Sequence, residues 1–153
     1  MLALGLGTAG AVIVLDQLSK WAILALLDQA IAVTPFLNLV VVWNRGVSFG
    51  MFDSASAHGP WLLSGLAVAV VVALVFWLRR VDHPLPGIAL GLIIGGALGN
   101  VLDRVRYGAV VDFLDVHALG YHWPAFNVAD SAICVGAALL LVDGLLAPRR
   151  QIT

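Results

Sequence analysis

The sequence has no glutamate, one lysine and one cysteine among its 153 residues. Charged residues make up 11% of the chain, against about 25% in an average soluble domain. So few charges cannot cover the surface of a short chain in water, which excludes an ordinary soluble enzyme and a disordered protein. The net charge of −1, with no basic stretch longer than two residues, excludes a nucleic-acid-binding protein.

Other absences exclude particular kinds of chemistry. Cys134 has no second cysteine to pair with, and its apolar surroundings make it a small core residue rather than a nucleophile. Without glutamate the H-E-x-x-H zinc-protease motif is impossible. The apolar N-terminus lacks a basic region, so we expect no removable signal peptide.

What the chain has is long apolar runs: 61% of its residues are hydrophobic and its mean hydropathy is +1.02. A helix needs about 20 such residues to cross the hydrocarbon core. The sequence therefore predicts one all-α membrane domain over 1–153 with four transmembrane helices. The helices are expected at approximately 2–27, 59–78, 85–106 and 125–147, with outer segments at 28–58 and 107–124.

An even number of spans puts both termini on one side of the membrane. Arg79–Arg80 and Arg149–Arg150 are free-standing flanks of helices on that side. The other side holds Arg45, Arg104 and Arg106, with Lys20 near it, and of these Arg45 and Arg104 lie within denser motifs. The positive-inside rule then favours cytoplasmic termini. In the outer segments, residues 32–43 and 109–116 are apolar runs typical of short strands, the first interrupted by Pro35, and we expect both to pack at the membrane surface.

Charges within the apolar runs need an explanation, because a charge at the membrane centre costs at least about 2.5–3.5 kcal/mol. Asp16 and Lys20 share one face of the first helix, either as a self-neutralising pair with Lys20 snorkelling outward or as functional groups. Asn100, Asp103 and Arg104 make one polar face at the outer end of the third helix. That face has more hydrogen-bonding groups than a helix cap requires.

Two further acids fall on the same side of the predicted topology. Asp112 stands between apolar residues in the second run, and Asp130 follows Asn127 by three residues, as an acid does after an N-cap. Two carboxylates that meet would repel, so that one holds a proton while the other stays ionised. Such a pair can hydrolyse an amide: the ionised acid takes a proton from water, and the other donates to the carbonyl oxygen or leaving nitrogen.

The residues alone leave open which acids form the pair. Asp103 has Arg104 beside it, which favours its ionised form and an orienting role, whereas Asp112 has no adjacent cation and more easily holds a proton. We expect Asp130 to be the ionised member, because the helix dipole favours an anion there.

Two functions of other classes remain to be compared with hydrolysis. A proton-coupled transporter subunit would use membrane acids as a relay, but would spread them through the bilayer, whereas here Asp143 alone stands apart from a cluster at one end. A structural helix-bundle partner would need only the small residues that let helices pack closely, Gly91, Gly95, Gly96 and Gly99. That interpretation leaves the clusters of Asn and Asp unexplained.

Five blocks of the sequence resemble, in order, the motifs of the bacterial lipoprotein signal peptidases (signal peptidase II). The third and fifth are the most specific, and the blocks extend from residue 16 to residue 130. They are Asp16-Gln-Leu-Ser-Lys20, Asn44-Arg-Gly-Val-Ser-Phe-Gly50, Gly95-Gly-Ala-Leu-Gly-Asn-Val-Leu-Asp-Arg104, Val110-Val-Asp-Phe113 and Phe126-Asn-Val-Ala-Asp130.

The resemblance implies an intramembrane aspartyl endopeptidase with four transmembrane helices, a small extracytoplasmic β-cradle and a short helix, sited in the bacterial cytoplasmic membrane. Its substrate would be a prolipoprotein whose lipobox cysteine carries diacylglycerol, cut on the N-terminal side of that cysteine. No metal or organic cofactor is implied, and the expected partners are membrane lipids and a globomycin-type cyclic-peptide inhibitor. The family's catalytic pair falls on Asp112 and Asp130. Supporting or substrate-binding positions fall on Asp16, Lys20, Asn44, Gly46, Asn100, Asp103, Arg104 and Asn127.

Overall fold

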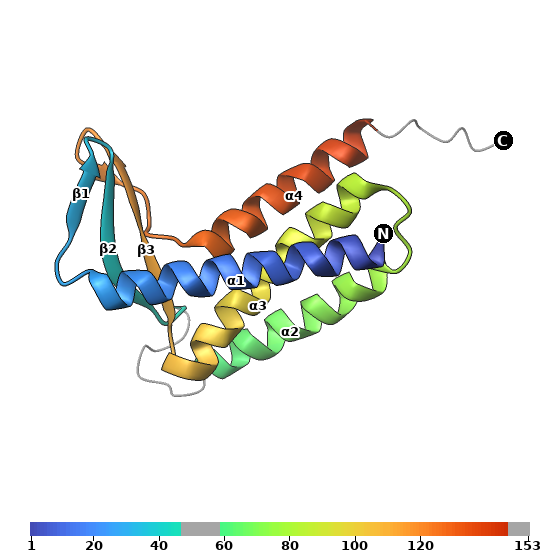
Figure 1. Ribbon diagram of the computed structural model, residues 1–153, viewed down its shortest axis with the longest axis horizontal. Helices are drawn as coiled ribbons and strands as arrows, with labels where there is room; N and C mark the ends of the chain where they lie inside the picture. Colours follow the sequence, from blue (N-terminus) through green and yellow to red (C-terminus); the bar gives the residue numbers. More distant parts are fainter. Residues whose placement is uncertain (47–58, 147–153) are drawn as a thin grey trace.

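The computed structural model describes residues 1–46 and 59–146. Its helices are α1 (Leu2–Leu26), α2 (Gly59–Leu78), α3 (Pro84–Tyr107) and α4 (Val128–Leu146). All four are long and apolar enough to cross a membrane, which confirms the predicted spans. The N-terminus of α1 and the C-terminal end of α4 lie at one end of the bundle, and a small sheet lies at the other (Figure 1).

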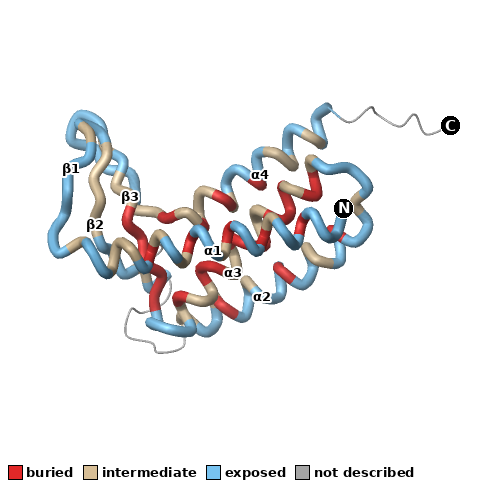
Figure 2. Tube along the Cα trace, in the orientation of Figure 1, coloured by how far each residue is buried: buried red, intermediate tan, exposed pale blue. Residues whose placement is uncertain are grey.

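The third helix is the centre of the bundle. α3 contacts α1, α2 and α4, and Figure 2 shows buried residues along its length. Leu90 and Ile94 of α3 pack with Ala9 of α1 and Leu78 of α2 in the apolar core. The other three helices expose large apolar side chains, as helices do when lipid surrounds them. The bundle therefore buries its central helix and leaves an apolar outer surface.

Glycines on α3 allow the neighbouring helices to approach closely. A Cβ atom at Gly95 would lie 2.6 Å from the carbonyl oxygen of Ala9, and one at Gly99 would lie 2.6 Å from Oδ2 of Asp16. Gly95 thus confirms the predicted role of these small residues in packing. Gly99 has an additional role, because it leaves room for a carboxylate inside the bundle.

The sheet is antiparallel and has the strand order β1-β2-β3-β4. Its strands confirm both predicted extended runs, with Pro35 in the turn between the first two strands. The first four residues of β3 are buried at the junction with the helices (Figure 2). The strands are β1 (Ile31–Thr34), β2 (Leu37–Asn44), β3 (Val110–Ala118) and β4 (Tyr121–His122).

A bulge in β2 aligns two polar residues of the sheet. The pairing with β3 shifts between Leu39 and Val42, where β2 carries one more residue than β3. Bulges bend a strand and change the direction of its side chains. After the bulge Val42 lies opposite Asp112, so Asn44, two residues further along, lies on the same face as Asp112.

Some details differ from the sequence expectations. The fourth helix begins at Val128 rather than near 125, because Phe126 pairs with Leu114 of β3 and Asn127 occupies the cap position. The expected short helix is not found among the described residues, and 47–58 of the outer segment lies outside them. Arg149 and Arg150 also lie outside the described residues.

Replacing Gly95 by alanine should weaken the contact between α1 and α3. The added Cβ would overlap the backbone of α1, and overpacking of this kind typically costs about 1–3 kcal/mol. We therefore expect Gly95→Ala to lower the melting temperature in detergent. The matched control is Gly7→Ala, whose Cβ would meet no atom within 4 Å. Equal melting temperatures for the two variants would contradict the packing role of Gly95.

Candidate active site

The chain's only lysine is buried near the sheet end of the bundle. The side-chain Nζ of Lys20 lies 2.9 Å from Oδ2 of Asp16 and 2.7 Å from Oδ2 of Asp103. It also donates a 3.1 Å hydrogen bond to Oδ1 of Asn100 on α3. The predicted pair with Asp16 is therefore present, and of the two alternatives for Lys20 the outward-snorkelling one is wrong, because Lys20 is 3% exposed. The second carboxylate and the amide give the ammonium the partners that burial demands.

Asp16 links α1 to the start of α4. Its Oδ1 accepts a 3.0 Å hydrogen bond from the backbone N–H of Ala129, in the first turn of α4. The first N–H groups of a helix have no partners within the helix, and the helix dipole favours a negative charge beside them. Asp16 therefore caps a helix that begins 112 residues later in the chain, at Val128.

Asp103 links α3 to β3. Besides Lys20, it accepts hydrogen bonds from the backbone N–H of Val111, at 3.1 Å, and from Nε2 of Gln17, at 2.9 Å. The cation in contact with Asp103 is thus Lys20 rather than Arg104, its neighbour in the sequence. Two acids of the predicted site, Asp16 and Asp103, share one ammonium and are fully occupied by partners.

Gln17 is a site residue that the sequence analysis did not select. Its Nε2 donates to Asp103 and Asp16 and to the carbonyl oxygen of Gly99, while its Oε1 accepts from Arg106. One signal could have identified it. Gln17 stands three residues before Lys20 in an apolar helix, which is the spacing that places two side chains on one face.

Asn100 connects Lys20 to Asp130 by hydrogen bonds. Because its Oδ1 accepts from the ammonium, its Nδ2 is left to donate, and it donates a 2.8 Å hydrogen bond to Oδ1 of Asp130. The structure thereby brings Asp130, on α4, against the polar face predicted on α3.

Asn127 and Asp130 form a reciprocal cap at the start of α4. The backbone N–H of Asp130 donates to Oδ1 of Asn127 at 2.9 Å, and the backbone N–H of Asn127 donates to Oδ2 of Asp130 at 3.2 Å. This confirms the predicted cap. The Nδ2 of Asn127 also donates a 2.7 Å hydrogen bond to Oδ1 of Asp112. The cap residue therefore bonds to both acids, so capping and site formation are one arrangement.

Asn44 holds the other oxygen of Asp112. Its Oδ1 accepts a 2.8 Å hydrogen bond from the backbone N–H of Gly46, which leaves Nδ2 to donate to Oδ2 of Asp112 at 2.9 Å. Gly46 has a φ of +86°, and a Cβ there would overlap Leu63 of α2. Glycine is favoured in that backbone conformation and in that space, so Gly46 orients the amide of Asn44.

The electrostatics of Asp112 differ from those of Asp16 and Asp103. Burial and, to a smaller extent, the nearby charge of Asp130 raise the pKa of Asp112 to about 6, against the hydrogen bond from Asn44, which lowers it. In residues 1–46 and 59–146, no cation lies within ion-pair distance of Asp112 or Asp130. An acid held by neutral amides beside a second acid is suited to keeping a proton.

Arg104 is near these acids but not paired with them. Its guanidinium interacts at longer range with Asp130, Asp103 and Asp112. Its Nε is buried and has no hydrogen-bond partner within the described part of the chain. A half-buried guanidinium in this position is available to a carbonyl oxygen or an anion.

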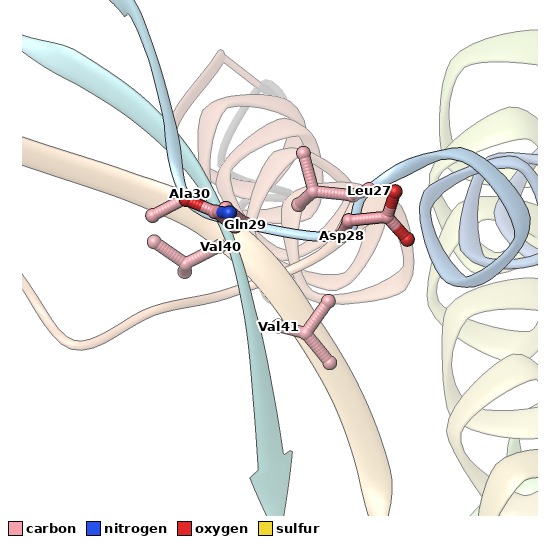
Figure 3. Close-up of a pocket in the computed structure, with 6 residues that line it drawn as sticks. All are labelled: Leu27, Asp28, Gln29, Ala30, Val40 and Val41. Carbon is pink, nitrogen blue, oxygen red and sulfur yellow. The ribbon is translucent and has the colours of Figure 1, made fainter.

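A separate hollow of about 270 Å³ lies between the end of α1 and the bulge in β2 (Figure 3). None of its lining residues takes part in the network around the acids. They are Leu27, Asp28, Gln29, Ala30, Val40 and Val41. Among the described residues, no group of three or more His, Cys or Asp side chains is arranged to hold a metal ion.

Comparison with known proteins agrees with this architecture. Residues 8–146 match the family model described as signal peptidase (SPase) II. A lipoprotein signal peptidase from Methylobacterium sp. (strain 4-46) is 51% identical over 146 residues, which cover 93% of this chain and 88% of the relative. One from Ralstonia nicotianae is 50% identical over 150 residues, which cover 96% of this chain and 86% of the relative.

Solved structures show the same fold. A structure described as a bacterial membrane enzyme superposes with a TM-score of 0.83 at 30% identity, over 94% of each chain. A second structure of the same description has a TM-score of 0.81 at 28% identity, over 97% of this chain and 94% of the other. The family match and these relatives cover nearly the whole chain, and we conclude that it belongs to the signal peptidase II family.

Proposed function

We propose that this chain is an aspartyl endopeptidase that removes signal peptides from diacylglyceryl-modified prolipoproteins. Asp112 and Asp130 form its catalytic pair, and cleavage occurs on the N-terminal side of the lipidated cysteine. Membership of the signal peptidase II family supports a membrane protease that processes lipoproteins. The observation that carries the choice of mechanism is Asn127, which donates hydrogen bonds to both acids.

The two acids have different surroundings, and this supports a division of roles. Asp130 lies in the first turn of α4 and accepts from two N–H donors, which favours its anion as the general base that activates water. Asp112 is buried with a raised pKa, which favours its protonated form as the donor to the substrate's carbonyl oxygen or leaving nitrogen. A single proton shared by the pair is then sufficient for amide hydrolysis.

The contacts of Asp103 argue against it as the rival member of the pair. It accepts from Lys20, from Gln17 and from a backbone N–H, so it is held as an anion against a cation, which neither Asp112 nor Asp130 contacts among the described residues. We assign to Asp103, and to Asp16 on the same ammonium, the role of positioning residues. The four acids thus have two functions: Asp16 and Asp103 hold the helices together, and Asp112 and Asp130 carry out the hydrolysis.

Substrate contacts and orientation follow from the surroundings of the pair. Arg104 is placed to bind a backbone carbonyl of the substrate, since its Nε has no partner within the described residues. Arg79 and Arg80 are exposed at the end of α2 opposite the sheet, which supports cytoplasmic termini and an active site towards the outer face of the cytoplasmic membrane. A globomycin-type cyclic peptide would inhibit by occupying the same site.

A proton-transporting function has less support. A relay needs acids distributed along a path through the bilayer. Asp16, Asp103, Asp112 and Asp130 instead join one network at the sheet end of the bundle. Within the described residues, Asp143, near the other end of α4, makes no ion pair or hydrogen bond with them. The family match points to proteolysis as well.

Replacing either acid of the pair by asparagine should abolish most cleavage of a lipidated prolipoprotein. Removing a positioned acid or base typically costs at least about 100-fold in rate. We expect a loss of that order in Asp112→Asn and in Asp130→Asn, measured by the size shift of purified substrate in detergent. Asp115→Asn is the matched control, since Asp115 lies on the same strand but bonds to Asn38 and His122 instead. Near-normal turnover by Asp112→Asn would overturn the assignment.

The pH dependence of cleavage should report the proton on Asp112. The protonated form is present below about pH 6 and is lost as the pH rises through that value, so kcat/KM should fall on the alkaline side. The hydrogen bond from Asn44 lowers the pKa of Asp112, and Asn44→Ala should raise that pKa. The alkaline limb should therefore move to higher pH.

Asn38→Ala is the control for this shift, because Asn38 lies on β2 but bonds to Asp115. We expect its alkaline limb to stay at the wild-type position. An alkaline limb that is unmoved in Asn44→Ala, or that moves to lower pH, would contradict the role given to Asp112.

A further inference from the structure

Towards its free end, the sheet has one polar and one apolar face. Side chains alternate along a strand, so Asp112, Leu114 and Val116 of β3 share one face and Asp115 and His117 share the other. Residues that lie opposite each other in an antiparallel pair point to the same face. The register of the sheet therefore assigns each paired strand residue to one of the two faces.

Contacts confirm the polar face. Oδ2 of Asp115 accepts a 2.9 Å hydrogen bond from Asn38 on β2, and its Oδ1 lies 2.8 Å from Nδ1 of His122 on β4. The rings of His117 and His122 are stacked with their centroids 4.8 Å apart. All four side chains of this group point away from the face that carries Asp112.

The face that carries Asp112 becomes apolar and exposed towards the free end of the sheet. Val116 is 39% exposed, and Ile31, paired with Leu39 of β2, is 51% exposed. Tyr121, paired with Ala118 of β3, is 69% exposed. An antiparallel sheet normally packs its apolar face on other protein and leaves the polar face to water. Here no described residue covers it at this end.

The tip of the β3–β4 hairpin carries a residue that its turn disfavours. Leu119 and Gly120 have φ values of +52° and +82°, the conformation in which Asn-Gly is preferred and a bulky side chain is strained. Leu119 is nevertheless fully exposed and packs on nothing in the described molecule. Trp123, whose N–H donates to the carbonyl oxygen of Val116, is 61% exposed. Phe36, whose carbonyl oxygen accepts from the N–H of His117, is 59% exposed.

The direction of the strands keeps this tip at the level of the helix ends. Figure 1 shows the strands running across the long axis of the bundle, with the free end of the sheet projecting sideways. Helices that span the bilayer therefore hold the strands roughly parallel to the membrane plane. The sheet end of α1 exposes Trp21 and Leu26, so the apolar surface of the spanning helices reaches this level.

We propose that the apolar face and the Leu119 tip bind the lipid leaflet at the sheet end of the bundle, at the boundary of headgroups and acyl chains. Tyr121 and Trp123 then occupy the depth at which aromatic residues gather in membrane proteins. The polar face, with Asp115 and His122, faces water. This goes beyond the proposed function, since it holds whatever reaction the acids perform, and it places the face that carries Asp112 towards lipid.

Spin labels on the hairpin test this arrangement. Single cysteines are introduced as Leu119→Cys and, for the matched control on the polar face, His122→Cys, both in a Cys134→Ala background. Each labelled protein is reconstituted into phosphatidylcholine–phosphatidylglycerol vesicles, and collision rates are measured with oxygen and with a water-soluble nickel complex. We expect at least about a threefold higher ratio of oxygen to nickel collisions at residue 119 than at residue 122, because oxygen concentrates in the apolar interior. Equal ratios would overturn the proposal.

A second variant separates lipid contact from packing within the protein. Leu119→Asn suits the positive φ of the turn, so without a packing role for leucine its melting temperature in detergent should equal or exceed that of the parent. A lower melting temperature would show that Leu119 packs on protein, and the proposed lipid contact of the tip would be wrong.

Discussion

The ammonium of Lys20 is the interaction on which the site depends. A buried charge is tolerated only with good partners, and this one lies between Asp16 on α1 and Asp103 on α3. Asp16 also caps α4, and Asp103 also accepts from β3, so one cation ties three helices to the sheet. Removing it would leave two buried carboxylates unbalanced. The close approach of the helices, allowed by glycines such as Gly99, brings these groups within reach.

The amide side chains of Asn100 and Asn127 connect this ammonium to the acid pair. Lys20 determines which end of Asn100 can donate, and Asn100 then donates to Asp130. The N-cap of α4, Asn127, bonds to Asp130 and Asp112 together. Only Asp16 and Asp103 thus contact the ammonium. Asp112 and Asp130 instead accept hydrogen bonds from neutral donors. That difference leaves a proton to be shared where hydrolysis is proposed.

Part of this arrangement could be predicted from the sequence, because hydropathy and spacing are local. The four spans, the two extended runs and the cap formed by Asn127 and Asp130 follow from patterns of a few residues each. The cap on α4 from Asp16 could not be predicted, since it joins residues 113 apart in the chain. The inward direction of the Lys20 side chain and the contacts of Gln17 depend on the distance between α1 and α3. That distance cannot be predicted from the sequence of either helix alone.

The sheet shows the same limit. Alternation predicts strands, but the bulge between Leu39 and Val42, which places Asn44 on the face of Asp112, arises from the pairing of two segments far apart in the sequence. The positive φ of Gly46 is likewise explained by its neighbours, the amide of Asn44 and the side chain of Leu63 on α2. The polar positions could be predicted from the sequence, whereas which of them hydrogen-bond to one another could not.

The central claim is that the acid pair activates water directly. Its most direct test is a single turnover of a diacylglyceryl prolipoprotein in ¹⁸O-water, followed by mass spectrometry of the released signal peptide. The account predicts one solvent oxygen in the new C-terminal carboxylate. A carboxylate without solvent oxygen would contradict it, because the oxygen would then have come from an enzyme side chain acting as a nucleophile.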